Sequence, residues 1–197
     1  MLFINSDDLL ASPHAISSLV DARLRYAGTK SVVCYSDFIK HYPSLDRSLL
    51  LNANDACDKG FMLCHQAMLV DRSAYDHVGI FDTSFRYAAD HDWTARAKRA
   101  GVEFMKADVP PTVIFRHGGA SHASYRLSRA EGGRVILREY GRAAYFRYTV
   151  RQYWVRFLRE LSDRLVRLIG TRALASLQGF YFRRIRRYHE FDPSKRQ

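Results

Sequence analysis

The sequence predicts an α/β fold followed by a basic helical tail, and three observations support this prediction. A helix pattern over 13–27 precedes a buried strand pattern over 31–39, and strands and helices continue to alternate further along the chain. The composition is that of one globular domain, with 47% hydrophobic and 26% charged residues in 197. Beyond Gly118 and Gly119 the pattern becomes helical and rich in arginine.

The first 60 residues are predicted to form strand, helix, strand and a polar connection. The helix has three boundary signals, with Ser12 as N-cap, Pro13 at its first position and Gly28 as its stop. The expected elements are a strand at 1–4, a helix at 13–27, a strand at Ser31–Ile39 and a polar segment at 40–60 with a short strand at Leu49–Leu51.

The following residues continue the alternation and then become helical. Gly79 closes a short helix, and Gly101 ends a longer one that Asp90 opens. The expected strands are Phe61–Val70, Val102–Lys106 and Thr112–Arg116, and the expected helices are Arg72–Val78, Asp90–Arg99, Ser128–Tyr140 and Tyr145–Ile169.

Charge is distributed unevenly between two segments that we treat as domains. Residues 1–124 carry 13 basic and 14 acidic side chains, whereas residues 125–197 carry 18 basic and 6 acidic ones. The excess positive charge therefore lies in the tail and indicates an anionic partner there. With no signal-peptide pattern and no bilayer-spanning apolar run, we expect a cytoplasmic protein whose membrane contact, if any, is peripheral.

The cysteines favour buried, reduced thiols. Cys34, Cys57 and Cys64 are odd in number and match neither a zinc pattern nor a redox pair. Cys64 and His65 are neighbours on a predicted strand and point to opposite faces, which argues against a Cys/His nucleophile. A chain of this length needs no metal to fold, so a bound metal is expected to be functional.

Three groups of polar side chains stand where chemistry is expected. Asp7 and Asp8 follow the first strand, and their oxygens suit Mg²⁺ or Mn²⁺ carrying a diphosphate; capping a turn is the alternative. Asp90 and Asp92 begin a helix, whose dipole keeps a general base ionised, although aspartate is also a preferred N-cap. His117 precedes two glycines and is either a metal ligand or an ordinary loop residue.

Taken in order, four stretches of residues resemble the bacterial family 2 glycosyltransferases, which have the GT-A fold and build surface polysaccharides from nucleotide-sugars. The resemblance covers about residues 1–124, and its specificity lies in the order and spacing of the stretches. Phe3–Asp8 is similar to the Asp-x-Asp region, and His117–Ser121 is similar to the element that closes the donor site. Cys64–Ala67, with Val70–Tyr75 and Gly79–Asp82, is similar to the acceptor-side segment. Phe85–Trp93, with Arg96 and Gly101, is similar to the stretch that bears the catalytic base.

The resemblance implies a metal-dependent, inverting transfer of a sugar from a nucleotide-sugar donor to a saccharide or lipid-linked acceptor. It makes Asp90 the base that takes the proton of the acceptor hydroxyl. Asp7 is then a ligand of Mg²⁺ or Mn²⁺, and His117 either completes the metal site or contacts the diphosphate. The implied binding residues are Asn5, Asp7 and Asp8 for the donor, and His65, Gln66, Asp92 and Trp93 on the acceptor side.

The chain departs from the family in two respects. Asn5 stands where many members have an acidic residue. Family members also carry a further half-domain ahead of this region, which holds the nucleotide. The resemblance therefore implies a partial, Rossmann-like GT-A sheet without its N-terminal nucleotide-binding half, and a C-terminal part of an enzyme whose activity by itself is in question.

The tail has several interpretations. Arginines alternate with aromatic residues at 145–154 and again at 181–188, as in an amphipathic helix that lies on an anionic membrane. Alternatively, the apolar side chains of the second tail helix pack as one stripe on the catalytic domain and the arginines face water. The stripe consists of Val150, Trp154, Phe157, Leu158, Leu161, Leu165 and Leu168. A different class of function is a non-catalytic basic module that binds membrane or nucleic acid, but no recognisable nucleic-acid motif supports the latter.

Overall fold

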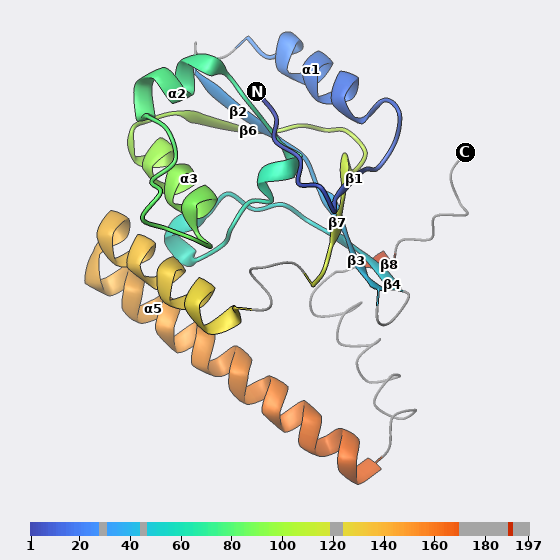
Figure 1. Cartoon of the computed structure of the whole chain (residues 1–197), viewed down its shortest axis with the longest axis vertical. Coiled ribbons are helices and arrows are strands. Elements are labelled where there is room, and N and C mark those ends of the chain that lie inside the picture. Colours follow the sequence, from blue (N-terminus) through green and yellow to red (C-terminus); the bar gives the residue numbers. More distant parts are fainter. Residues whose placement is uncertain (28–30, 44–46, 119–123, 170–188, 191–197) are drawn as a thin grey trace.

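The structure is a computed structural model that describes residues 1–27, 31–43, 47–118, 124–169 and 189–190. These residues form a mixed α/β structure with two mixed β-sheets, which confirms the predicted fold class at this level. Figure 1 shows helices on both faces of the smaller sheet and a long helical hairpin beside them.

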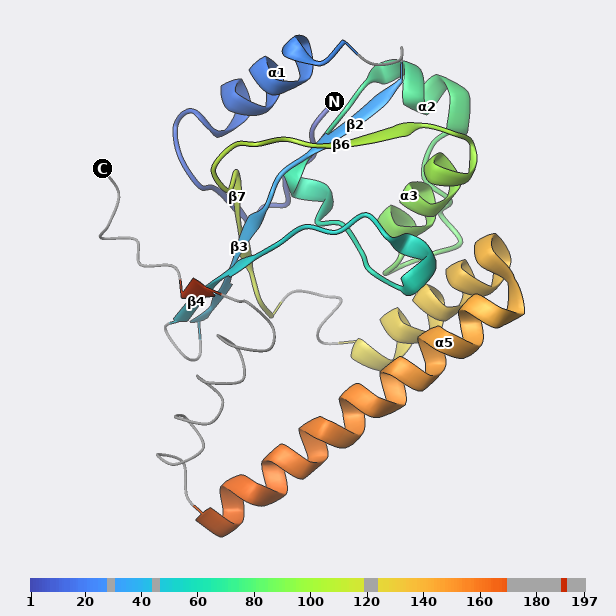
Figure 2. The ribbon, with the colours of Figure 1, turned by 180° about the vertical axis from the view of Figure 1, so that it is seen from behind.

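The smaller sheet has three strands and is covered by helices on both faces. Its strands are β2 (Val32–Tyr35), β5 (Met68–Val70) and β6 (Glu103–Lys106), and its helices are α1 (Ala15–Arg25), α2 (Arg72–Val78) and α3 (Ala89–Arg99). The central strand β2 pairs antiparallel with β5 and parallel with β6. Helix α1 lies on one face, and α2 and α3 lie on the other (Figures 1 and 2).

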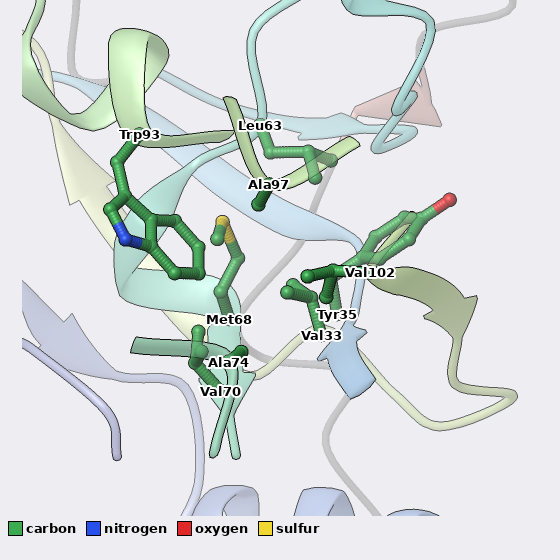
Figure 3. Close-up of a cluster of buried hydrophobic side chains, with 9 residues drawn as sticks. All are labelled: Val33, Tyr35, Leu63, Met68, Val70, Ala74, Trp93, Ala97 and Val102. Carbon is green, nitrogen blue, oxygen red and sulfur yellow. The ribbon is translucent and has the colours of Figure 1, made fainter. Parts of the chain in front are cut away.

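Alternation along β2 explains why both faces are covered. Val33 and Tyr35 belong to the main buried cluster, which also contains Trp93 of α3 (Figure 3). Cys34, which lies between them, packs with Leu19 of α1. Successive side chains of a strand point to opposite faces, so a strand covered on both sides is apolar throughout, as the four buried residues of β2 are.

The larger sheet brings the N-terminal region beside the strand that ends at Arg116. Its strands, in spatial order, are β1 (Leu9–Leu10), β7 (Val113–Arg116), β3 (Phe38–Tyr42), β4 (Arg47–Leu51) and β8 (His189–Glu190). β1 and β7 are antiparallel, with Leu9 opposite Ile114. The residues just before β1 therefore lie at the same end of the sheet as those just after β7, which places Asp7 and His117 at one edge.

The strand expected over Ser31–Ile39 is two strands, β2 and β3, in different sheets. The break at Ser36 and Asp37 is stabilised by residues far away in the sequence. The Ser36 hydroxyl hydrogen-bonds that of Thr112 at 2.7 Å, and the Ala53 N–H donates to the Asp37 carboxylate at 2.7 Å. Because these partners are distant, the hydrophobic pattern does not reveal the break.

Two other strand predictions are wrong in detail. Residues 1–4 form no strand, although Met1 and Val70 exchange two backbone hydrogen bonds at the edge of β5. The strand expected over Phe61–Val70 is reduced to β5, because the 3₁₀ turn η3 (His65–Ala67) precedes it. The polar segment 40–60 contains the end of β3, all of β4 and the 3₁₀ turn η2 (Cys57–Lys59).

The helices agree better with prediction than their caps do. α2 ends at Gly79 as expected, and β6 and β7 lie within one residue of their predicted bounds. His14 rather than Ser12 occupies the N-cap of α1, and Ala88 occupies that of α3, so Asp90 lies in the first turn of α3 instead of capping it. The predicted stop at Gly28 lies outside the described residues.

The tail begins with α5 (Tyr125–Ile169), which consists of two helices divided at Gly141. Gly141 has φ 78° and ψ −177°, a conformation that is open almost only to glycine. The first half of α5 (125–140) and the second half (142–169) lie side by side in both views, with the first half near α3 (Figures 1 and 2). In the described part of the chain, no helix is long and apolar enough to cross a bilayer. The cluster at 181–188 lies outside the described residues.

Candidate active site

Asp90 and His65 form a polar pair at the N-terminus of α3. His65 Nδ1 donates to Asp90 Oδ2 at 3.0 Å, and the His91 backbone N–H donates to Asp90 Oδ1 at 2.8 Å. The side chains of His65 and Asp90 are 27% and 29% exposed, so a ligand in solution can reach them. The structure thus brings together the predicted base and one predicted acceptor-side residue.

The surroundings of Asp90 hold its carboxyl group in the ionised form. Burial by itself raises the pKa of Asp90. The hydrogen bond and charge of His65, together with the N–H and charge of His91, outweigh that effect and place the pKa below its usual value. The N-terminus of α3 also favours a negative charge. Asp90 is therefore deprotonated at neutral pH, as a general base must be.

The pair forms part of the lining of a small pocket whose other walls are largely aromatic. The aromatic residues are Phe3, Tyr75, Phe81 and Trp93. Neighbouring rings in this group have centroids between 4.5 and 6.3 Å apart. The cavity has a volume of about 10 Å³, room for about one water molecule, so the rings pack mainly on one another and the space beside Asp90 holds nothing larger than a hydroxyl group.

Asp8 and Gln66 form a second polar pair close to the first. Gln66 Nε2 donates to Asp8 Oδ2 at 2.5 Å, and the Arg116 N–H donates to Asp8 Oδ1 at 3.1 Å. Asp8 is 7% exposed and Gln66 is 1% exposed, so Asp8 acts here as a buried, fully hydrogen-bonded carboxylate. In η3, Gln66 contacts Asp8 of the predicted donor side and the adjacent His65 contacts Asp90. This short turn therefore links the two polar pairs.

Asn5, Asp7 and His117 are the remaining residues predicted for the donor side. Asn5 and Asp7 are exposed ahead of β1, and the His117 ring packs against Tyr42 with centroids 4.6 Å apart. Across the described ranges, no group of three His, Cys, Asp or Glu side chains lies close enough to hold a metal. A Mg²⁺ or Mn²⁺ ion bound through a substrate diphosphate needs only one or two protein carboxylates, and the exposed Asp7 fits that smaller requirement.

Asp92 and Trp93, both expected on the acceptor side, have different surroundings. Asp92 is fully buried and ion-paired with Arg138 and with Arg96, the latter at 2.9 Å. Trp93 lines the pocket, and its Nε1–H donates to the Gly79 carbonyl at 2.8 Å. The structure therefore brings Trp93 to the site, whereas Asp92 joins α3 to α5.

Cys64 is unsuited to nucleophilic chemistry for a reason other than the predicted one. It does not lie on a strand with His65, since η3 begins directly after it. Burial raises the pKa of Cys64 to about 12, and its thiol donates to Gln66 Oε1 at 3.0 Å. The nucleophilic form is the thiolate, which this environment disfavours.

Glu131 of α5 is a site residue that sequence reasoning missed. Its carboxylate accepts the backbone N–H groups of Tyr87 at 2.7 Å, Ala88 at 3.0 Å and Arg86 at 3.2 Å, which come just before α3. The first half of α5 thereby holds the segment that leads into Asp90. No local signal marks Glu131, because its partners are 43 to 45 residues away.

Comparison of the chain with protein-family models, with curated proteins and with solved structures finds no match. The functional interpretation therefore depends on the geometry of this site and on the order of the sequence stretches.

Proposed function

We propose that the chain carries the acceptor side and the catalytic base of a GT-A glycosyltransferase of the bacterial family 2 type. The observation that carries this proposal is the Asp90–His65 pair, an ionised and reachable carboxylate at a helix N-terminus beside an aromatic pocket. The pocket also supports it, because Phe3, Phe81 and Asp90 come from three of the four stretches that resemble the family.

In the proposed reaction, Asp90 removes the proton of an acceptor hydroxyl. The hydroxyl oxygen then forms a bond to the anomeric carbon of the donor sugar. The bond between that carbon and the diphosphate breaks on the opposite side, and its electron pair leaves with the nucleoside diphosphate. Attack from the side opposite the leaving group inverts the anomeric configuration. His65 orients the carboxylate through Nδ1 and keeps it ionised.

Asp7 is the proposed ligand of the divalent ion on the donor diphosphate, with His117 as a second ligand at the same edge of the larger sheet. Bound there, Mg²⁺ or Mn²⁺ would supply positive charge to the departing diphosphate. Asn5 lies in the same exposed segment and would contact the donor. Asp8 is buried and accepts a hydrogen bond from Gln66, so it would stabilise this segment without contacting the donor.

A transfer assay with substitutions at the polar pair tests the proposal. The full chain, alone and joined to any residues encoded in frame before Met1, is incubated with Mn²⁺ and a panel of nucleotide-sugars, and release of the nucleotide is measured. Asp90→Asn should lower the rate by about a thousandfold, because a general base contributes about 10² to 10⁴ in rate. Asp76→Asn, an exposed carboxylate on α2, is the matched control and should leave the rate unchanged.

His65→Gln adds a readout that a purely structural role would not move. Without the charge and hydrogen bond of His65, the pKa of Asp90 should rise, so the acidic limb of the pH–rate profile should move to higher pH. Full activity in Asp90→Asn, or no turnover in either form of the chain with any donor, would contradict the proposal. The latter result would favour the non-catalytic basic module.

A further inference from the structure

The second half of α5 carries a continuous row of exposed apolar side chains. Residues at intervals of three and four along this helix share one face. The exposed fractions are 69% for Phe146, 50% for Val150, 67% for Tyr153, 54% for Phe157 and 42% for Leu161. We call these five residues the apolar face; Trp154 borders it, is 60% exposed, and stacks on Phe157 with ring centroids 5.7 Å apart.

The opposite side of the same helix packs on the rest of the protein. Ala144 is 2% exposed and Tyr148 is 8% exposed, and the Tyr148 hydroxyl donates to the Arg129 carbonyl at 3.2 Å. Arg151 donates to the Lys59 carbonyl at 3.1 Å. Because these contacts fix the helix on one side, the apolar face points outward, and its far end lies away from the other described elements (Figures 1 and 2). The interpretation that the predicted stripe packs on the domain is therefore wrong for the five of its side chains that the structure describes, which are all exposed: Val150, Trp154, Phe157, Leu158 and Leu161.

The charges next to the apolar face are almost all positive. Residues 142–161 contain five arginines and one glutamate. Arg142, Arg147 and Arg156 are exposed. An apolar surface bordered by cations matches a layer in which anionic groups lie directly above apolar chains.

We infer that the apolar face docks the protein on the surface of an anionic lipid bilayer. The aromatic side chains would insert at the level of the headgroups, and the flanking arginines would meet the lipid phosphates. Three of the five side chains of this face are phenylalanine or tyrosine, and Trp154 borders it, whereas paired helices favour aliphatic residues. A second copy docked face to face would bring like charges together. Nucleic acid would pair with the arginines but would leave the aliphatic part of the face in water.

The docked helix is continuous with the part of the protein that holds Asp90. The first half of α5 contacts the segment before α3 through Glu131, and the hairpin joins this half to the apolar face. Docking would therefore keep the pocket at a constant distance from the bilayer. The inference itself does not depend on catalysis, because it stands on exposure and charge alone.

Vesicle binding by the full chain tests the inference. Binding is measured by sedimentation with vesicles of phosphatidylcholine alone and of phosphatidylcholine with about one third phosphatidylglycerol. We expect binding only to the second composition, with quenching of Trp154 when the acyl chains carry bromine. Trp93 is 1% exposed and should not be quenched.

A matched pair of double variants locates the contact. Phe146→Ser with Phe157→Ser should weaken vesicle binding by about tenfold or more, since two exposed aromatic anchors are lost. Leu24→Ser with Ile80→Ser removes two side chains that are 76% and 79% exposed elsewhere, and should bind as the unmodified chain does. The inference would be overturned by equal binding of both variants, by absent quenching, or by a dimer in sedimentation velocity that the first variant dissociates. It would also be overturned if an oligonucleotide bound with the same sensitivity to the first variant.

Discussion

His91 lies on α3, is buried against α5, and has an unusual environment for a titratable side chain. It is 3% exposed, and within the described residues neither ring nitrogen has a hydrogen-bond partner. A Cβ placed on Gly132 would lie 3.7 Å from its Nδ1, so α5 packs directly against the ring. Burial lowers the pKa of His91, although the charge of Asp90 opposes that effect.

The depressed pKa of His91 predicts a specific pH dependence of stability. In the unfolded chain His91 takes up a proton near its ordinary pKa of 6.5, whereas in the folded protein it resists protonation. The free energy of unfolding should therefore be fully retained above that pH and should fall as the pH drops below it. The loss approaches about 1.4 kcal/mol for each unit by which the pKa is depressed.

Urea unfolding at about pH 7.5 and about pH 5 measures this effect. His91→Asn removes the titrating group, so the variant should lose less stability between the two pH values than the unmodified chain. Its absolute stability can differ without affecting the comparison, because the difference between pH values is the readout. Equal pH dependence in the two proteins would show that His91 is not the responsible group.

At the scale of elements, the first half of α5 holds the segment that leads into α3. Ala88, at the N-cap of α3, has no side chain that can accept a hydrogen bond. Glu131 holds the residues that lead into α3 from another helix, through bonds to the N–H groups of Arg86, Tyr87 and Ala88, and the Asp90 carboxylate accepts the His91 N–H in the first turn. Since charged acceptors form the stronger hydrogen bonds, this contact stabilises the docking of α5 as well as the start of α3.

Glu131→Gln should lower the free energy of unfolding by about 1 to 2 kcal/mol, because an amide offers only one acceptor oxygen to these donors. Glu160→Gln is the control on the same element. The Glu160 side chain is 53% exposed and, among the side chains that the structure describes, pairs with Arg156 alone, so the stability of this variant should not change measurably. Thermal unfolding of both variants checks the prediction. An equal stability of Glu131→Gln and Glu160→Gln would contradict the role of Glu131 in holding the segment before α3.

At the scale of the whole molecule, the helical hairpin is part of the domain core rather than an appendage. Val135 of α5 is fully buried with Phe85, Ala88 and Ala95. Arg138 pairs with the buried Asp92 and, at 3.3 Å, with Asp82. Removing α5 would expose the apolar cluster and leave Asp92 with one cation fewer, and an incompletely paired buried charge is costly.

Two truncated chains test this view of the core. A chain ending at residue 124 should fail to unfold cooperatively, whereas a chain ending at residue 152 keeps Val135, Arg138 and Tyr148 and should remain folded. Near-ultraviolet circular dichroism during heating distinguishes them, because fixed aromatic packing gives a signal that disappears on unfolding. If the shorter chain unfolds at the temperature of the full chain, the hairpin contributes nothing to the core.

Local signals in the sequence determined much of the secondary structure. The spacing of Leu19 and its neighbours predicts α1, and Gly79 with its positive φ of 86° closes α2 as expected. The two tail helices are also confirmed, with a glycine between them. These features depend on residues within one or two helical turns, so a reading of the sequence can reach them. The sequence also marked Asp90, His65 and Trp93, which the structure brings to one pocket.

Contacts between distant residues decided the rest. The division of one apolar segment at Ser36, the pairing of Asp8 with Gln66, and the burial of Asp92 each depend on partners that register and packing bring together. The same holds for Glu131, whose partners follow no local pattern. The helical periodicity predicted the apolar stripe that contains Phe157. It could not predict whether the stripe faces the domain or the solvent, because that depends on the face of the helix by which Tyr148 packs on the domain.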